Sequence, residues 1–398
     1  MSEFTDFLVK VDDLVWGIPL IVLILAAGIY LTFRLRLLQI VHLPKALKYM
    51  FKNEEDGHGE VSSFGALCTA LSATIGTGNI VGVATAIGCT ALGTAVGGPG
   101  ALFWMWVAAF FGMATKYAEG FLAVRYRTID EEGHVLGGPF YYIENGMGHK
   151  WKWLAKVFAF FGACVGLFGI GTFTQVNGIA SAVQSFFDPN KEDTVSILGN
   201  DYSIAIVITA FALAICVGLV VIGGIKRIAS VSQVIVPFMA ILYIVAVLVL
   251  IVTNIEKLPG ALATIVEYAF GVKAVAGGVL SSIAISMQKG IARGIFSNEA
   301  GLGTGSIAHA TADTSQPVKQ GLFGIFEVFT DTIVICTLTA LIILCSGINV
   351  PYGQAAGAEL TIQGFTATYG GWVSIFTAIA LCCFAFSTTI GWGLYGSR

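Results

Sequence analysis

The segment from Val61 to Gly98 constrains the fold most, because it is an apolar stretch long enough to cross a membrane that is interrupted at its middle. The interruption reads Ser72-Ala73-Thr74-Ile75-Gly76-Thr77-Gly78-Asn79. Each of its two glycines costs a helix roughly 1 kcal/mol relative to alanine. Backbone groups freed in hydrocarbon are tolerated only where they are buried in protein or line a watery cavity. The sequence therefore predicts a helix that breaks at the membrane midplane around a ligand.

Composition assigns the chain to the membrane class. Hydrophobic residues make up 56%, charged residues 11%, and the mean hydropathy is +0.83. We predict an all-α integral membrane protein surrounded by lipid, with about nine spans of roughly 20 residues. The expected spans lie near 14–33, 61–96, 99–122, 154–187, 202–222, 229–252, 274–296, 321–347 and 372–391. The eight cysteines form no C-x-x-C pair, which favours packing roles over a metal site.

The basic residues predict the orientation. If the N-terminus is outside, all but four of the 21 Lys and Arg residues fall in segments on the cytoplasmic side. The four exceptions are Lys10, Lys191, Lys257 and Lys273. The positive-inside rule thus favours a multi-pass protein of the plasma (inner) membrane with its N-terminus outside. Residues 34–60, which mix basic and apolar side chains, are expected to form an amphipathic helix on the cytoplasmic surface.

A second interruption is expected in the span near 274–296. It reads Ser281-Ser282-Ile283-Ala284-Ile285-Ser286-Met287-Gln288-Lys289-Gly290, and its span runs opposite to the first broken one, five spans later. Two broken spans in matching places of opposite direction are typical of an inverted-repeat transporter. The alternative is close packing of small residues between helices.

The first break suggests how a ligand would be held. Freed amides of Gly76, Thr77 and Gly78, at the positive end of the outer half-helix, would bind a carboxylate. Carbonyls released from the inner half-helix are hard oxygen ligands that suit Na⁺, and Thr77 and Asn79 add side-chain oxygens. The carbonyls expected in this role belong to Ser72, Thr74 and Ile75. At the second break, carbonyls from Ala284 to Met287 would hold an ammonium group.

Ionisable residues within expected spans point to function by default. Asp331 is a candidate for a cation or proton role, and Arg293 and Glu299 for a cytoplasmic gate, with interfacial anchoring as the alternative. Lys116 and Glu119 are interpreted as an interfacial pair. His309, in a polar stretch, is assigned to a solvated loop or short helix.

Enzymatic chemistry finds no support in the sequence. It contains no H-E-x-x-H, G-x-S-x-G or P-loop motif, and Gly76-Thr77-Gly78 follows a membrane helix and not a strand, so it is no dinucleotide fingerprint. We expect no organic cofactor and no nucleic-acid partner. The oligomeric state stays open.

Three motifs resemble those of the alanine or glycine:cation symporter family. They are Gly97-Gly98-Pro99-Gly100-Ala101-Leu102-Phe103-Trp104-Met105-Trp106-Val107, Gly294-Ile295-Phe296-Ser297-Asn298-Glu299-Ala300-Gly301 and Thr388-Thr389-Ile390-Gly391-Trp392-Gly393-Leu394-Tyr395-Gly396. The family resembles the leucine-transporter fold, whose first core helix breaks at a G-x-G-N element. Here that element is Gly76 to Asn79.

The resemblance implies roles for particular residues. Gly76 to Gly78 would hold the substrate carboxylate, and Gln175 would contact the substrate. Thr74 and Asn79 would lie near one cation. Ser72 and Ile75, facing Thr388 and Thr389, would form a second cation site.

The resemblance also implies the organisation of the chain. Residues 1–60 would form an extra N-terminal helix and the amphipathic segment, residues 61–255 the first five-helix repeat, and residues 274–398 only the first three helices of the second repeat, which is apparently truncated. The expected function is symport of alanine or glycine into the cell by alternating access, coupled to a cation, with Na⁺ preferred over H⁺. A small pocket lined by Ala73, Gly76, Gly82, Ala284 and Gly290 is expected. The alternatives are an uncoupled facilitator or channel and a membrane-embedded amino-acid sensor.

Overall fold

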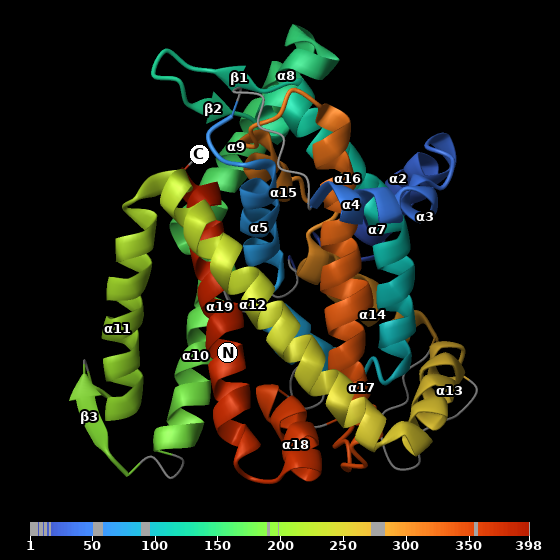
Figure 1. The fold of residues 1–398 in the computed structure, drawn as a ribbon, viewed down its shortest axis with the longest axis vertical. Helices are drawn as coiled ribbons and strands as arrows, with labels where there is room; N and C mark the ends of the chain where they lie inside the picture. Colours follow the sequence, from blue (N-terminus) through green and yellow to red (C-terminus); the bar gives the residue numbers. More distant parts are fainter. Residues whose placement is uncertain are drawn as a thin grey trace.

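The computed structural model describes residues 17–50, 59–88, 96–188, 192–197, 199–271, 283–353 and 357–397, with residues 7, 11, 14 and 15. In these ranges the chain is helical apart from two short antiparallel hairpins (Figure 1). One hairpin pairs β1 (Thr128–Ile129) with β2 (Val135–Leu136), and the other pairs β3 (Thr194–Ile197) with β4 (Asn200–Ser203). The all-α prediction is confirmed for the described residues.

The helices follow the order of the expected spans. In the first half they are α2 (Ile18–Arg34), α3 (Leu38–Val41), α4 (Leu43–Met50), α5 (Ser63–Thr74), η1 (Gly78–Gly82), α6 (Val83–Ile87), α7 (Gly100–Arg125), α8 (Pro139–Met147), η2 (His149–Trp151), α9 (Lys152–Phe168), α10 (Ile170–Phe187), α11 (Ile204–Val221) and α12 (Gly224–Thr253). In the second half they are η3 (Ile255–Lys257), α13 (Leu258–Ala269), α14 (Ile283–Asn298), α15 (Gly305–Ala310), α16 (Pro317–Val328), η4 (Phe329–Cys336), α17 (Thr337–Cys345), α18 (Ala358–Tyr369) and α19 (Val373–Ser397).

Several of these helices can cross a membrane. By length and composition, five described helical segments qualify: His149–Gln184, α11, α12, Pro317–Cys345 and α19. The pair Ser63–Thr74 and Gly78–Ile87 would make a sixth span, bent by 48°. The chain is therefore a multi-pass membrane protein whose first predicted broken span is present as a broken helix.

One expected span is present with an interruption, and another needs correction. The span expected over 154–187 lies within the membrane-length segment His149–Gln184, in which α9 and α10 meet at Gly169 in the left-handed conformation (φ +62) that glycine adopts without steric cost. The second interruption was expected over residues 281–290, but Ile283–Asn298 is one continuous helix, α14. Residues 272–282, which hold the rest of that expectation, lie outside the described residues.

Within the described part of the segment expected to lie as an amphipathic helix on the surface, residues 34–50 and 59–60, the structure has the short helices α3 and α4. Ala46 of α4 is fully buried in an apolar cluster with Met113 of α7 and Leu322 of α16. The segment is therefore packed against the helices that surround the break.

The broken helix lies between two groups of helices. α12 and α19 pack on one side of α5, and α15 and α16 pack against it as well. α7 packs along both α14 and α16, and η1 contacts α14 and η4. Figure 1 shows α5 in blue between α19 and α12 and the group formed by α7, α14 and α16. The break is thus enclosed by segments from both halves of the sequence.

Candidate functional site

The break in the first core helix is held open by two side-chain amides. α5 ends at Thr74 and η1 begins at Gly78. The Gly76 N–H donates to Asn79 Oδ1 (2.8 Å), and the Thr77 N–H donates to Gln175 Oε1 of α10 (3.0 Å). In a continuous helix these two N–H groups would bond the carbonyls of Ser72 and Ala73. At the break these N–H groups therefore do not bond the Ser72 and Ala73 carbonyls.

Glycine fits position 76 without displacing its neighbours, because two side chains approach its α-carbon. A β-carbon there would collide with Thr388 Oγ1 and lie 3.1 Å from Gln175 Oε1. At Gly78 the nearest atoms, from Phe296 and Ser297, would be 3.8 Å away. The backbone is thus tightly packed at Gly76 and more open at Gly78.

Asn79 joins the break to Asp331. Its Nδ2 donates to Asp331 Oδ1 (2.7 Å) and to Ser297 Oγ (3.1 Å), while its Oδ1 accepts from Gly76. Asp331 Oδ2 accepts from Thr332 Oγ1 (2.7 Å), and both Asn79 and Asp331 are fully buried. Asn79 lies in η1 and Asp331 in η4, which are both π-helical, a conformation found frequently at functional sites. The structure brings together two residues that the sequence suggested separately.

The second predicted cation group is partly assembled. Thr388 Oγ1 of α19 lies 3.1 Å from the Ile75 carbonyl and 3.0 Å from the Phe384 carbonyl of its own helix, and Ser387 Oγ lies 3.4 Å from the Ile75 oxygen. Thr389 Oγ1 instead bonds the Ala385 carbonyl of its own helix (2.9 Å). Ile75 and Thr388 therefore meet as expected, whereas the Thr389 hydroxyl is engaged within α19.

The remaining predicted oxygen donors lie on α5. Ser72 Oγ bonds the Thr69 carbonyl (2.7 Å), and a β-carbon at Gly391 of α19 would lie 2.5 Å from it. Thr74 Oγ1 lies 3.3 Å from the carbonyls of Ala70 and Leu71. Both hydroxyls are therefore turned back to α5, so any cation contact of Ser72 would use its carbonyl.

A cavity of about 750 Å³ reaches the break. Near the break it is lined by Thr74, Gly78, Gln175, Ser297 and Thr388, and farther away by residues of α8 and α9. Its walls are aromatic in part, with Phe140, Tyr141, Phe158, Phe161, Phe296 and Trp392. The small pocket expected at the substrate site stays a prediction, since this cavity extends from the break to α8 and α9. Of the five residues named for that pocket, only Ala73 is among those lining the described cavity.

Ala284 and Met287 do not lie at the break. Both are exposed residues of α14, and Ser297 is the residue of that helix that bonds Asn79. At 1.5 Å per residue, Ala284 lies about 20 Å and Met287 about 15 Å from Ser297 along the axis. Their carbonyls belong to a continuous helix, so the predicted ammonium site is not formed by a break there.

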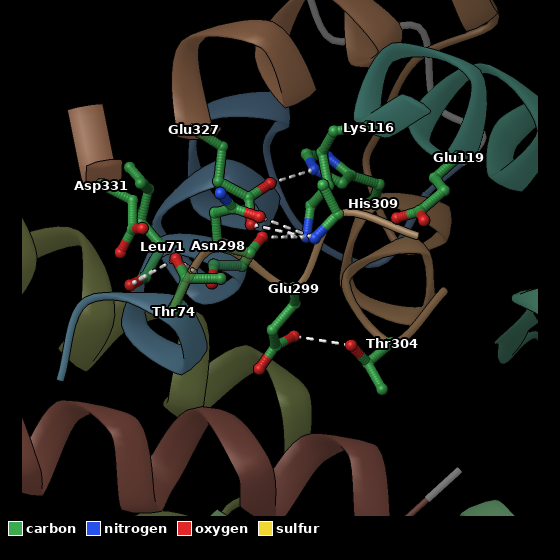
Figure 2. Close-up of polar contacts among 12 residues, drawn as sticks. Leu71, Thr74, Lys116, Glu119, Asn298, Glu299, Thr304, His309, Glu327 and Asp331 are labelled. Atoms are coloured by element: carbon green, nitrogen blue, oxygen red, sulfur yellow. Dashed lines mark hydrogen bonds and ion pairs between the residues drawn. The ribbon is translucent and has the colours of Figure 1, made fainter. Parts of the chain in front are cut away.

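A buried ionic cluster lies beside the break. Lys116 Nζ of α7 lies 3.1 Å from Glu327 Oε1 of α16 and donates to the Asn298 carbonyl at 3.1 Å. His309 Nε2 of α15 lies 3.0 Å from Glu327 Oε2, and His309 Nδ1 lies 2.8 Å from Gln320 Oε1. Figure 2 shows Lys116, His309 and Glu327 pointing toward one another. All three side chains are completely buried.

Two further carboxylates border this cluster. Glu119 Oε1 accepts from the N–H groups of Gly301 (2.8 Å) and Gly303 (3.2 Å), and Glu299 Oε2 accepts from Thr304 Oγ1 (2.6 Å). Glu299 also lines the cavity, while Arg293 lies over the Phe296 ring at 5.9 Å. The two expected gate residues, Arg293 and Glu299, are thus held by different partners.

Sequence reasoning missed this cluster. Lys116 and Glu119 were interpreted as an interfacial pair and His309 as solvated, but all three are buried and contact other elements. The available signal was the presence of ionisable residues inside or beside apolar runs. The pairing itself joins α7, α15 and α16 across about 200 residues, which no local pattern encodes.

A broken helix whose freed backbone meets a cavity among membrane-length helices defines a membrane carrier. Comparison with known proteins agrees. The model of the "Sodium:alanine symporter family" matches residues 1–398. The chain therefore belongs to the sodium:alanine symporter family and is a transporter, not an enzyme.

Similar curated proteins cover nearly the whole chain. The sodium/alanine symporter AgcS of Methanococcus maripaludis is 44% identical over 404 residues, which cover 100% of this chain and 83% of AgcS. An uncharacterized transporter of Haemophilus influenzae is 48% identical, with 99% and 81% covered. The probable sodium/glutamine symporter GlnT of Bacillus subtilis is 40% identical, with 100% and 77% covered.

Proposed function

We propose that this protein is a Na⁺-coupled symporter of a small neutral amino acid, alanine or glycine, in the plasma (inner) membrane. The observation that carries the proposal is the junction at the break. There, the Ile75 carbonyl, which with the Thr388 hydroxyl suits a cation, is followed directly by the Gly76 and Thr77 amides, which suit a carboxylate. The family of the chain and the printed name of its relative AgcS support this choice of ion and substrate.

The cation would bind between α5 and α19. The Ile75 carbonyl and the Thr388 hydroxyl are neutral hard oxygens that approach to 3.1 Å, as two ligands of one ion can. The Ser72 carbonyl, to which the Gly76 N–H does not bond at the break, would be a third ligand, and Thr389 an adjacent one. A second cation position near Thr74 and Asn79 follows from the resemblance alone.

The substrate would bind where the cavity meets the break. Its carboxylate would face the amides of Gly76, Thr77 and Gly78, close to the positive end of η1 and α6. Gln175 lines the cavity at this point and would contact the substrate. Asp331, which orients Asn79, and the buried cluster around Glu327 and Glu299 would link cation binding to movement of the surrounding helices.

Transport would proceed by alternating access between repeats of the leucine-transporter type, with 61–255 as the first repeat and 274–398 within the second. With the N-terminus outside, the end of the cavity lined by α8 faces the cytoplasm. One Na⁺ moving down about 100 mV and a tenfold gradient supplies about 3.7 kcal/mol. That free energy sustains a several-hundred-fold accumulation of substrate, so one cation suffices.

Uptake of labelled L-alanine into proteoliposomes tests the proposal. We expect accumulation above equilibrium with an inward Na⁺ gradient, and none with a K⁺ or pH gradient alone. Equilibration of alanine that ignores the gradient would instead indicate a facilitator. Na⁺-dependent binding without flux would indicate a sensor.

A further inference from the structure

Two of the three N–H groups at the break, those of Gly76 and Thr77, already have partners that resemble a carboxylate. Gly76 donates to the Asn79 amide oxygen and Thr77 to the Gln175 amide oxygen. An amide oxygen and a carboxylate oxygen are both acceptors with two lone pairs. A buried N–H left without an acceptor is costly, so a carrier without substrate needs such replacements. The carboxylate of an incoming substrate therefore meets occupied donors at Gly76 and Thr77.

The two replacements are held very differently. Asn79 is fixed by hydrogen bonds to Ser297 and to the side chain and carbonyl of Asp331, and it does not line the cavity. Within the described ranges, the Gln175 side chain makes one hydrogen bond, to Thr77, and it lines the cavity. Gln175 can therefore leave its N–H when a stronger acceptor arrives, whereas Asn79 cannot leave without breaking its bonds to η4.

We propose that substrate loading is an exchange of acceptors at the Thr77 N–H. The substrate carboxylate replaces the Gln175 amide oxygen there, while the Asn79 amide oxygen continues to accept from the Gly76 N–H. The inference rests on the proposed function, since it concerns the same amides. An ionised acceptor forms a stronger hydrogen bond than a neutral amide, so the exchange favours the carboxylate. The displaced Gln175 amide turns into the cavity, where water or the substrate satisfies it. Gln175 thus acts as a competitor of the substrate as well as a contact.

The exchange predicts an unusual effect of removing Gln175. Gln175→Met keeps the length of the side chain but lacks the acceptor. In this variant the Thr77 N–H has no side-chain acceptor before the substrate binds. L-alanine binding measured at saturating Na⁺ should then become about 2- to 10-fold tighter, the value of one net hydrogen bond. Gln184→Met, on the same helix and away from the cavity lining, is the matched control and should leave the Kd unchanged. If Gln175 were only a substrate contact, its loss would weaken binding.

Unchanged or weaker binding by folded Gln175→Met would overturn the exchange. If the wild-type protein bound no amino acid in the presence of Na⁺, the proposed function itself would fail, which separates the two claims.

A second measurement needs no variant. Solid-state NMR of ¹⁵N-labelled side-chain amides should show that L-alanine shifts the Gln175 signal and not the Asn79 signal. Any other pattern overturns the proposal.

Discussion

Lys116 of α7 and Glu327 of α16 form an ion pair of 3.1 Å in which neither side chain is exposed. Lys116 also donates to the Asn298 carbonyl at the end of α14, where a positive charge complements the helix dipole. A single ammonium group thereby joins three helices beside the break. Since His309 contacts the second oxygen of Glu327, α15 is joined to the same point.

Removing Lys116 should therefore destabilise the protein strongly. Lys116→Met leaves Glu327 as a buried charge without its counter-ion, and we expect a loss of about 3–5 kcal/mol in the free energy of unfolding. The double variant Lys116→Met with Glu327→Gln removes both charges and should recover most of that loss. Denaturant unfolding in detergent measures both variants. A single variant as stable as the wild type would contradict the role of the pair.

Asn79 and Asp331 should behave as a unit. Asn79→Asp places a carboxylate 2.7 Å from that of Asp331, and the repulsion should abolish Na⁺-dependent alanine uptake. The double variant Asn79→Asp with Asp331→Asn exchanges the two residues. It restores an amide donor facing a carboxylate acceptor, and the carboxylate at position 79 can still accept from the Gly76 N–H. We expect the double variant to regain measurable uptake, as a double-mutant cycle would show. An inactive double variant that folds normally would count against the pairing.

The two threonines of α19 should differ in their effect on sodium. Both hydroxyls bond a carbonyl of α19, but the Thr388 hydroxyl also lies 3.1 Å from the Ile75 carbonyl at the break. Thr388→Val should raise the Na⁺ concentration for half-maximal uptake about tenfold, the loss of one good ligand interaction. Thr389→Val, the matched control in shape, should have a much smaller effect. Equal shifts would mean that both hydroxyls hold the ion in the loaded carrier.

The glycines of the first broken helix should not be equivalent. Gly76→Ala forces a methyl group against Thr388 and Gln175 and should abolish uptake. Gly82→Ala, at the end of η1, meets no atom within 4 Å and should retain it. Uptake by reconstituted variants, normalised to folded protein, measures the difference. Uptake by Gly76→Ala at the level of Gly82→Ala would show that the close approach is dispensable.

The orientation can be tested through the cavity. Gly162 of α9 lines it and has open space around its α-carbon. In a background without other cysteines, Gly162→Cys should react with a membrane-impermeant thiol reagent from the cytoplasmic side. Gly218→Cys, on α11 and outside the cavity lining, serves as the control that should stay unlabelled. Labelling of Gly162→Cys only from the outside would reverse the proposed topology.

Local chemistry explains which parts of the site could be predicted from the sequence. Two glycines within an apolar run predicted the break, and the resemblance to a known family predicted that Ile75 would face Thr388. The contacts of His309 with Glu327, and of Asn79 with Asp331, depend on how distant helices pack. The part of the second interruption expected after Ile283 is not found, because small and polar residues such as Ser286 and Gly290 also occur in continuous helices, where they allow close packing.

Backbone hydrogen bonds join the start of α5 to the segment that follows α15. Val61, just ahead of α5, forms a parallel bridge with Ala312 after α15, and the Asp313 N–H donates to the Val61 carbonyl at 2.7 Å. The Arg127 guanidinium clamps the carbonyls of Ala310, Ala312 and Thr314 onto the end of α7. If α5 tilts, the loop after α15 and the C-terminal end of α7 must therefore move with it. The start of α5, the segment after α15 and the end of α7 should therefore move as one unit. A distance probe placed on any of these three stretches would report the motion of all three.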